Sequence, residues 1–459
     1  MSGRDETIVA PATALGRGAI AVVRLSGPHA TAIAAHILLP VPTVPRTATL
    51  TVIHEPHDVS RVIDRGVVTW FKAPASYTGE DVIEISVHGG ALVSALVQEA
   101  CVRAGARPAL PGEFTERAVL AGKLDLVQAE AVADLIDARS RAAHRAAVRQ
   151  LDGALSMRIN ALRDALLHVD ALIAYDIDFP SEDAAPPSRA RVLAACDDAL
   201  ARIDGLLATL PAAAMGREGA LVVLAGPPNA GKSALLNALV GEARVLVSEI
   251  PGTTRDAVEV LVDDAPYPLR LVDTAGLRAS GDALEQMGIE VSERYVAQAH
   301  VVLACAESVA ALTATVNALR PMTQGIVVPV RTKADLRGSI AEGLNEEQAA
   351  TPVDAITVSS VSGEGLDMLR TTVRNAVQLQ AALPDAETPL VTRARHETAL
   401  RRAHDELREF RAAWKSGALP APVAATHLRA AVAALESLIG AVDVEDILER
   451  VFRTFCIGK

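Results

Sequence analysis

The chain carries its clearest chemistry in a short glycine-containing run. Residues 226–233 read GPPNAGKS, directly after the apolar run 220–225 and at the start of a helical stretch. In such a loop the backbone N–H groups surround phosphate oxygens, while Lys232 reaches the β- and γ-phosphates and the Ser233 hydroxyl can bind Mg²⁺. These flanks favour a nucleoside triphosphate site over a plain glycine-rich turn.

Two later segments are suited to the triphosphate end of such a site. Asp273 ends an apolar run and begins DTAG (273–276), in which the acid can hold Mg²⁺ through water and the glycine N–H can contact the γ-phosphate. Between this segment and the loop lies PGTTRD (251–256), where a threonine can complete the Mg²⁺ shell. Ser233 and Thr254 are therefore the predicted Mg²⁺ ligands.

A third segment predicts which base is selected. Residues 332–335 read TKAD after another apolar run. The Asp335 carboxylate can accept hydrogen bonds from guanine N1–H and from the exocyclic amine, whereas adenine presents the wrong donor pattern. The stem of Lys333 can pack on the base, and the backbone of 359–361 can cap guanine O6. The segment therefore predicts GTP.

The elements that must position these motifs follow from hydrophobic patterning. Residues 1 to about 120 alternate short Val- and Ile-rich runs with one helical stretch, ALVSALVQEACVRAG, which indicates mixed α/β structure. Alanine-rich helices follow to about residue 210 and return after about 377. Between them, from about 219, apolar strands alternate with helices, which is typical of a parallel sheet covered by helices.

The predicted fold class is α/β plus α. A P-loop GTPase (Ras-like) domain at 216–379 is inserted into a discontinuous helical domain at 121–215 and 380–459. An N-terminal α/β domain at 1–120 precedes both.

Composition limits the alternatives. The chain has 56 acidic and 44 basic side chains and a net charge of −12, which argues against a protein that coats nucleic acid through overall charge. The four cysteines are far apart, and the N-terminus has no apolar signal region. No apolar run is long enough to span a membrane. We therefore expect a cytoplasmic protein without a membrane segment.

The ordered set GPPNAGKS, GTTRD, DTAGLR and TKAD resembles the translation-factor-like GTPases that include Era and EngA. The flanking segments SYTGEDVIEISVHGG, PGEFTERAVLAGKLDLVQAEAVADLI, YDIDFPSED and FCIGK resemble one branch across essentially the whole chain, the tRNA-modification GTPase MnmE (TrmE) family. One departure is Thr332, because asparagine usually stands there and its amide braces the loop.

With this resemblance the predicted GTP contacts can be given in full. They are Asn229, Ala230, Gly231, Lys232, Ser233, Ala234, Ser248, Glu249, Ile250, Pro251, Gly252, Thr253, Thr254, Asp273, Thr274, Ala275, Gly276, Thr332, Lys333, Ala334, Asp335, Ser359, Ser360 and Val361.

The catalytic group is less evident from the residues. Many GTPases orient water with a glutamine after Asp-x-x-Gly, but Leu277 stands at this position. The acids of 282–290 also fit a solvated helix face; the resemblance selects Glu285 to orient water.

The resemblance also implies a K⁺ ion in place of an arginine finger when two G domains meet. Its ligands would be Asn229, Ser248, Ile250 and Thr253. By itself, Asn229 also fits simple loop capping.

The resemblance further implies that the N-terminal domain dimerises and binds 5-formyltetrahydrofolate or a related one-carbon folate. Its contacts fall on Arg24, Glu84, Lys123 and Lys459, each of which alone also fits a surface ion pair. A carboxylate such as Glu84 can accept from the adjacent N–H donors of a pterin, while cations suit its glutamate tail. Cys456 is either a reactive thiol beside the one-carbon unit or a small buried apolar residue.

The family function implied is GTP hydrolysis coupled to modification of wobble uridine 34 in certain tRNAs. The partner is an FAD-dependent MnmG-type protein in a heterotetramer, and the product carries an aminomethyl or carboxymethylaminomethyl group at C5. The rivals are a ribosome-assembly switch of the Era/EngA type and a folate-dependent transferase with a regulatory G domain. Arginines at 139, 141, 145 and 149, and at 393, 395, 401 and 402, fit either tRNA phosphates or solvated helix faces.

Overall fold

A computed structural model of the chain describes residues 5–14, 16–178, 189–241, 244–245, 258–264, 266–274, 291–339, 355–381, 390–417, 419–440, 455 and 458. The chain divides into two compact units. The first comprises Met1–Ala133 with Leu435–Lys459, and the second comprises Asp134–Ala434. In these ranges no helix is both long and apolar enough to cross a bilayer.

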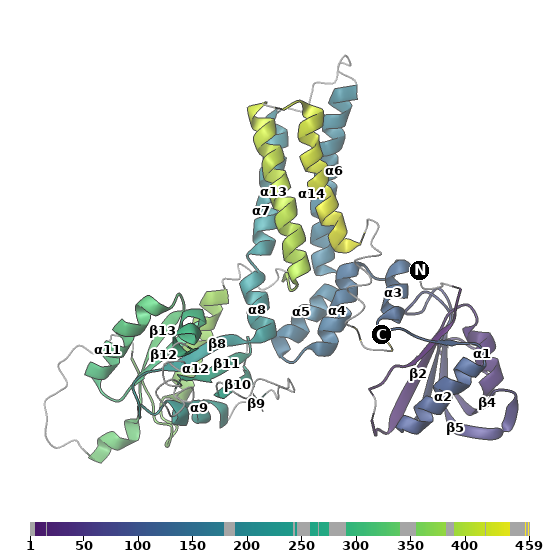
Figure 1. The fold of residues 1–459 in the computed structure, drawn as a ribbon, viewed down its shortest axis with the longest axis horizontal. Coiled ribbons are helices and arrows are strands. Elements are labelled where there is room, and N and C mark those ends of the chain that lie inside the picture. The colour runs from purple at the N-terminus through teal and green to yellow at the C-terminus, as the bar shows by residue number, and fades with distance from the viewer. Residues whose placement is uncertain are drawn as a thin grey trace. The chain divides into compact units, whose positions relative to one another are not determined.

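The first unit is built on a mainly antiparallel sheet (Figure 1), in the strand order β3-β4-β5-β6-β2-β1-β7, with a parallel pairing only between β1 and β7. Its strands are β1 (Ile8–Pro11), β2 (Ile20–Ser26), β3 (Leu38–Leu39), β4 (Thr49–Glu55), β5 (Asp58–Phe71), β6 (Val82–His88) and β7 (Arg107–Pro108). Its helices are α1 (Ala30–Ile37), α2 (Ala91–Arg103) and α3 (Glu113–Leu120), followed by α4 (Leu126–Asp137), which crosses the unit boundary.

Apolar side chains that alternate along the strands form the core of this unit. Val23 and Leu25 of β2 are fully buried and contribute to one apolar cluster with Ile85 of β6, Ile33 of α1 and Val97 of α2. The sequence predicted only one helix before residue 120, which was wrong. The helices α1 and α3 are eight residues each, too short for a clear helical period.

A buried carboxylate joins α3 to the sheet. Glu113 is 0% exposed and lies 2.7 Å from Arg107 Nη2 and 3.0 Å from Arg117 Nη2, and it accepts a hydrogen bond from the Leu110 N–H at 2.8 Å. Arg117 in turn lies 3.1 Å from Glu80. Burial by itself would raise the pKa of Glu113, but the hydrogen bonds from Arg107, Leu110 and Arg117 outweigh it and lower the pKa. The carboxylate therefore stays charged and anchors α3.

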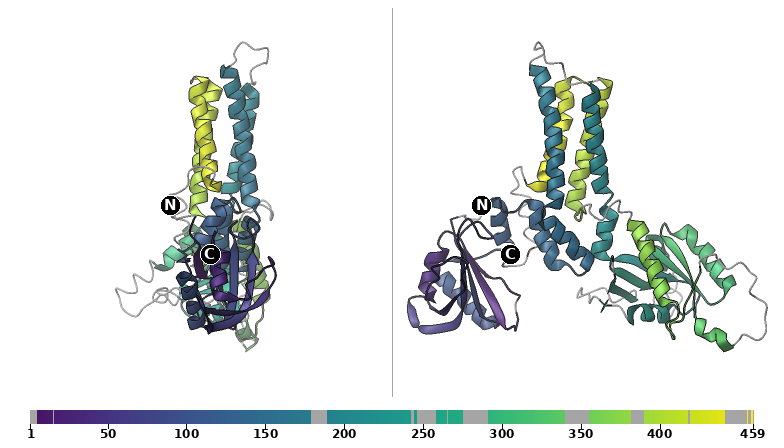
Figure 2. Two further views of the ribbon diagram at one scale, coloured as in Figure 1. Left: turned by 90° about the vertical axis from the view of Figure 1, so that its right-hand side faces the viewer. Right: turned by 180° about the vertical axis from the view of Figure 1, so that it is seen from behind.

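The second unit contains the helical bundle. Its helices are α5 (Arg141–Leu151), α6 (Ala154–Asp178), α7 (Arg189–Leu207), α8 (Leu210–Glu218), α13 (Ala394–Ser416) and α14 (Ala421–Ile439), and α14 crosses the unit boundary after Ala434. Figures 1 and 2 show α6, α7, α13 and α14 side by side. Arg411 of α13 pairs with Asp197 of α7, and Arg429 Nε of α14 lies 3.1 Å from Asp170 of α6. Helices that precede the α/β insert thus pair in space with helices that follow it, as predicted.

The second unit also holds a sheet in the order β14-β13-β12-β8-β11-β10-β9. Its strands are β8 (Ala220–Ala225), β9 (Arg244–Val245), β10 (Val258–Asp263), β11 (Leu269–Asp273), β12 (Val301–Ala306), β13 (Ile326–Arg331) and β14 (Ile356–Thr357). Its helical elements are α9 (Lys232–Gly241), α11 (Val309–Leu319), α12 (Leu366–Ala381) and the 3₁₀ turns η2 (Arg320–Met322) and η3 (Ala334–Ser339).

The inserted α/β fold class predicted from the sequence is confirmed, with one correction to the sheet. Strands β8, β11, β12, β13 and β14 are parallel, whereas β10 is antiparallel to both β11 and β9. Only residues 264–268 separate β10 from β11, which is too short for the crossover that parallel neighbours require. The hairpin could have been inferred from this spacing.

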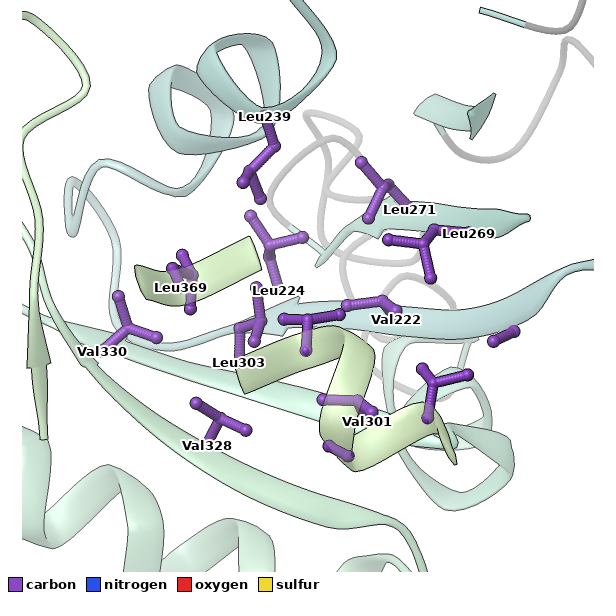
Figure 3. Packing of buried hydrophobic residues seen from close by; sticks show 14 of the residues in the cluster. Val222, Leu224, Leu239, Leu269, Leu271, Val301, Leu303, Val328, Val330 and Leu369 are labelled. Atoms are coloured by element: carbon purple, nitrogen blue, oxygen red, sulfur yellow. The ribbon is translucent and has the colours of Figure 1, made fainter. Parts of the chain in front are cut away.

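Strand β8 lies at the centre of the sheet and is buried along its whole length. Val222 and Leu224 face one apolar cluster with Leu239 of α9 and Leu369 of α12 (Figure 3), while Leu221 faces a second cluster that includes α11. Burial on both faces explains why the run reads as continuous apolar residues rather than as an alternation.

Buried hydrogen bonds hold residues 390–392, where the chain leaves the α/β insert, against helices that precede the insert. The Gln150 side chain is 1% exposed and donates to Leu390 O at 2.7 Å and to the Thr392 hydroxyl at 3.1 Å. The fully buried Thr209 hydroxyl accepts from the Val391 N–H at 3.0 Å. The exit of the α/β insert is therefore fixed to helices that precede it in the chain.

Candidate functional site: the nucleotide-binding edge of the sheet

The loop between β8 and α9 has the backbone geometry of a phosphate cradle. Gly226 has φ 153°, and a Cβ there would lie 2.1 Å from Cys305 O, so only glycine allows the loop to leave the sheet here. Asn229 and Gly231 also have positive φ values of 62° and 79°. The turns bend the loop back on itself before α9 begins at Lys232, as the motif predicted.

Lys232 has its ammonium inside this loop. The side chain is 5% exposed, and Nζ donates to Gly226 O at 2.9 Å and to Pro227 O at 2.8 Å. A lysine held at the loop rim by carbonyl groups can exchange them for phosphate oxygens, which carry full charge. Below it, burial raises the pKa of the Cys305 thiol to about 12, so this cysteine is a neutral part of the core.

A hydroxyl and a carboxylate meet at the start of α9. Ser233 Oγ donates a short hydrogen bond to Asp273 Oδ2 at the end of β11, and Asp273 is 3% exposed. The register of the parallel strands places Asp273 opposite Leu224, and the Thr274 hydroxyl donates to Leu224 O at 2.8 Å. Hard oxygen donors of this kind suit Mg²⁺ together with nucleotide phosphates. The described residues contain no group of three or more His, Cys, Asp or Glu that could hold a metal alone.

The segment 332–335, predicted to select the base, is bound to the phosphate loop by Thr332. This side chain is 4% exposed, and its hydroxyl donates to Ala230 O at 2.7 Å, with Ala306 O 3.3 Å away. Its N–H donates to Ala306 O at 2.9 Å. The threonine thus joins the two loops by itself, although the sequence suggested that this brace is lost without an asparagine amide.

Asp335 and Lys333 lie beside this brace. Ser359 Oγ donates to Asp335 Oδ1 at 2.5 Å, so the predicted guanine carboxylate already faces the loop that follows β14. Lys333 has φ 58° and pairs through Nζ with Glu307. A Cβ added at Gly231 would lie 3.8 Å from Lys333 Cε, which places the lysine stem against the phosphate loop.

The rest of the predicted site is only partly within the described ranges. Ala234 is in the first turn of α9, Ala334 begins η3, and Ser360 and the 83%-exposed Val361 follow β14. Several predicted residues lie outside the described ranges: Ser248, Glu249, Ile250, Pro251, Gly252, Thr253, Thr254, Ala275, Gly276, Glu285, Cys456 and Lys459.

In the first unit the structure brings together two of the residues predicted for folate. Arg24 of β2 and Glu84 of β6 are register partners, and Arg24 Nη2 lies 2.8 Å from Glu84 Oε1. Arg24 Nη1 also donates to Gly458 O at 3.4 Å, so Gly458 lies beside this pair. Lys123 is exposed, and its Cε lies 3.5 Å from the position of a Cβ added at Gly79.

Sequence reasoning missed two aromatic neighbours of this pair. The Arg24 guanidinium carbon lies 5.6 Å from the ring centroids of both Tyr77 and Phe114, within the range of cation–π attraction. Burial raises the pKa of Tyr77, whose hydroxyl lies 2.8 Å from the Thr115 hydroxyl. Both rings belong to the quoted segments SYTGED and PGEFTER, so their presence there was the available signal.

The phosphate cradle, the buried acid beside Ser233 and the loop predicted to select the base share one edge of a mainly parallel sheet. This is the arrangement of a P-loop GTPase. Two family models match the chain: "GTP-binding protein TrmE N-terminus" over residues 7–123 and "MnmE helical domain" over residues 126–456. The chain belongs to the MnmE family.

Curated relatives match over the full length. The proteins named tRNA modification GTPase MnmE from Akkermansia muciniphila, Azoarcus sp. and Methylobacterium radiotolerans are 40%, 41% and 42% identical. The alignments cover 100%, 99% and 99% of this chain and 100%, 98% and 99% of those proteins.

Similar solved structures cover only part of the chain. The G domain of the T. maritima FeoB iron transporter matches 35% of this chain and 98% of its own, at 25% identity and a TM-score of 0.25. Era from Aquifex aeolicus bound to GDP·AlF4⁻ matches 40% and 66%, at 22% identity and a TM-score of 0.26. The fold assignment therefore rests on the sheet and on the family models.

The brace between the loops gives a first prediction. Thr332→Val keeps the side-chain shape but removes the hydroxyl that bonds Ala230 O, so the base loop loses its link to the phosphate loop. We expect guanine nucleotide affinity to fall about tenfold, since an unmade buried hydrogen bond costs about 1–3 kcal/mol. Equilibrium titration with a fluorescent guanine nucleotide measures this. Thr332→Ser keeps the donor and should bind nearly normally; equal losses in both variants would contradict the role of the hydroxyl.

Proposed function

We propose that this chain hydrolyses GTP in the modification of wobble uridine 34 of certain tRNAs. It acts with an FAD-dependent MnmG-type partner in a heterotetramer, forming the 5-carboxymethylaminomethyl or aminomethyl group. The full-length match to relatives named tRNA modification GTPase MnmE carries this proposal. It favours tRNA modification over a ribosome-assembly switch because both flanking parts match as well as the α/β insert.

The nucleotide roles are proposed from the sequence motifs, with the contacts of Lys232, Ser233 and Asp335 in support. Lys232 releases the carbonyl groups of Gly226 and Pro227 and binds the β- and γ-phosphates. Ser233 binds Mg²⁺ together with Thr254, while Asp273 accepts from the metal's water. Asp335 accepts from guanine N1–H and the exocyclic amine. Hydrolysis opens and closes the G domains and is separate from the chemistry on uridine.

Cleavage is proposed to need no arginine finger. Glu285 orients the attacking water, and K⁺ supplies the positive charge when two G domains meet, held by Asn229, Ser248, Ile250 and Thr253. Asn229 is exposed and belongs to the phosphate loop, which supports its amide oxygen as a proposed ligand of a monovalent cation.

The homodimer is proposed to form through the first unit. Leu50 of β4 and Val67 of β5 are register partners, and they are 73% and 40% exposed. Neighbouring apolar side chains on an exposed sheet face favour association. Two chains held together in this way can present their G domains to each other.

Potassium-dependent pairing gives the second prediction. GTP turnover in K⁺ should exceed turnover in Na⁺ several-fold. Leu50→Asp should separate the chains, so turnover per chain in K⁺ should fall at low protein concentration and recover as the concentration rises. Steady-state phosphate release together with sedimentation measures both effects. Equal rates in K⁺ and Na⁺ would contradict the K⁺ site. A Leu50→Asp variant that stays dimeric would contradict the proposed interface.

The folate role is proposed for Arg24, Glu84, Lys123 and Lys459, with Cys456 beside the one-carbon unit. Glu84 accepts from the pterin N–H donors, and the aromatic rings of Tyr77 and Phe114 add flat apolar surface near the Arg24 guanidinium. Lys123 is exposed and available to the glutamate tail.

The third prediction tests this site. Glu84→Gln keeps the size of the side chain but loses the charge that pairs with Arg24 and with the pterin donors. We expect 5-formyltetrahydrofolate binding to weaken at least tenfold in calorimetric titration, because hydrogen bonds to charged groups contribute about 1.5–3 kcal/mol. Glu55→Gln changes a carboxylate of the same unit that is paired with Arg103 and should leave the affinity unchanged. Unchanged affinity in Glu84→Gln would remove this residue from the site.

The fourth prediction tests the function itself. In a bacterial strain that lacks its own member of the family, the wild-type chain should restore the C5-modified wobble uridine, measured by mass spectrometry of tRNA nucleosides. Asp335→Asn should not restore it, because the variant can no longer accept both guanine donors. A wild-type chain that is expressed but restores nothing would contradict the proposal.

The same variant provides the control for folding. Xanthosine triphosphate carries a carbonyl where guanine carries an amine, so it can accept from the amide of an asparagine at position 335. The purified variant should hydrolyse xanthosine triphosphate and discriminate against GTP. Unchanged preference for GTP would show that Asp335 does not contact the base.

A further inference from the structure

The second unit contains a polar hollow that the nucleotide site does not use. It has a volume of about 430 Å³ at the start of α5, beside the end of β10. Arg139, Arg141, His144 and Arg145, termed here the α5 cluster, contribute four exposed side chains. Ala138, Ser140 and Asp263 complete the lining. The hollow therefore has a basic wall and contains no large apolar side chain.

The sequence around the α5 cluster differs from the rest of the chain. Residues 138–151 contain no Asp or Glu, although the whole chain has 56 acidic and 44 basic side chains. The first turn of α5 contains no acid, and two arginines and a histidine lie in its first two turns. Cations are unfavourable near a helix N-terminus because of the helix dipole. A charge arrangement that lowers helix stability indicates a role in binding.

Within the described residues, few groups neutralise the α5 cluster. Arg141 Nε lies 3.7 Å from Asp263 Oδ2, and the Arg141 side chain is 77% exposed, so this ion pair is weak. Arg145 Nη2 donates to Pro266 O at 3.4 Å. The described ranges contain no ion-pair partner for Arg139. One carboxylate thus faces three guanidinium groups, which leaves net positive charge directed to solvent.

We propose that the α5 cluster binds the phosphate backbone of tRNA. Guanidinium groups bind phosphate through paired N–H donors, and three arginines within seven residues can contact successive phosphates. A protein partner is less well suited, because the centre of a protein interface is usually apolar or aromatic and the lining here is neither. This inference rests on the proposed function, since that function supplies the tRNA.

The position of the hollow connects RNA binding to the α/β insert. Asp263 ends β10, and the neighbouring Asp264 pairs with Arg374 of α12 at 2.7 Å. An RNA phosphate on Arg141 competes with Asp263 for the same guanidinium group. The contact between α5 and β10 therefore weakens when RNA is bound.

The test is binding of unmodified tRNA transcript to the full-length chain, measured by fluorescence anisotropy over a range of salt concentrations. In the triple variant Arg139→Gln, Arg141→Gln, Arg145→Gln, we expect tRNA affinity to fall about tenfold or more. The slope of log K against log salt should decrease by about 2, since each lost phosphate contact removes about 0.7–0.9. The corresponding triple Arg→Lys variant keeps the charge and should retain most of the affinity.

A matched control separates this site from overall charge. Arg158→Gln, Arg202→Gln and Arg408→Gln remove three exposed arginines from α6, α7 and α13 of the same unit, and they should leave tRNA affinity nearly unchanged. The glutamine triple variant at the α5 cluster should keep normal guanine nucleotide affinity, which shows that the chain is folded. Tenfold weaker tRNA binding with a normal nucleotide site supports the proposal.

Other results would overturn it. Unchanged tRNA affinity and salt slope in the glutamine triple variant exclude the α5 cluster as an RNA site. Loss of binding to an MnmG-type protein with unchanged tRNA binding assigns the surface to that protein instead. If the wild-type chain binds tRNA through the α5 cluster but restores no modified uridine in the strain test, the proposed function fails while this inference stands.

Discussion

Parallel strands end at a common edge of their sheet, and the nucleotide site depends on this constraint. Strand β8 is buried along its whole length and pairs in parallel with β11 on one side and with β12 on the other. Their carboxyl ends bring Asp273 beside Ser233 and Glu307 beside Lys333. The apolar core therefore positions the polar site, because no single loop holds all of these residues.

Within that edge, short hydrogen bonds set the relation between the loops. Thr332 joins the base loop to Ala230 of the phosphate loop, and Ser359 holds Asp335. Each contact involves a side chain that is buried or partly buried, where an unmade hydrogen bond is costly. These hydrogen bonds thus hold the loops in a fixed relation, and the ammonium group of Lys232 is held by backbone carbonyl groups of the phosphate loop.

In the first unit the carboxylates of Glu113 and Glu84 both pair with arginine but differ in burial. Glu113 is fully buried between Arg107 and Arg117, and breaking such a buried network costs about 3–5 kcal/mol. The pair Arg24–Glu84 is more exposed and lies near two aromatic rings. Both carboxylates pair with arginine, but they differ in burial. Glu113 is fully buried and anchors a helix, whereas the side chain of Glu84 is partly exposed to solvent.

The sequence by itself determined the features encoded over short distances: the phosphate-loop turn at 226–233, the strand ending at Asp273 and the helical blocks. Backbone preference and hydrophobic period act locally, so these can be read along the chain. Only the tertiary structure decided the brace from Thr332 to Ala230, the rings beside Arg24 and the place of Asp263 against the α5 cluster. These features join residues far apart in sequence, and their approach depends on how the strands and helices pack.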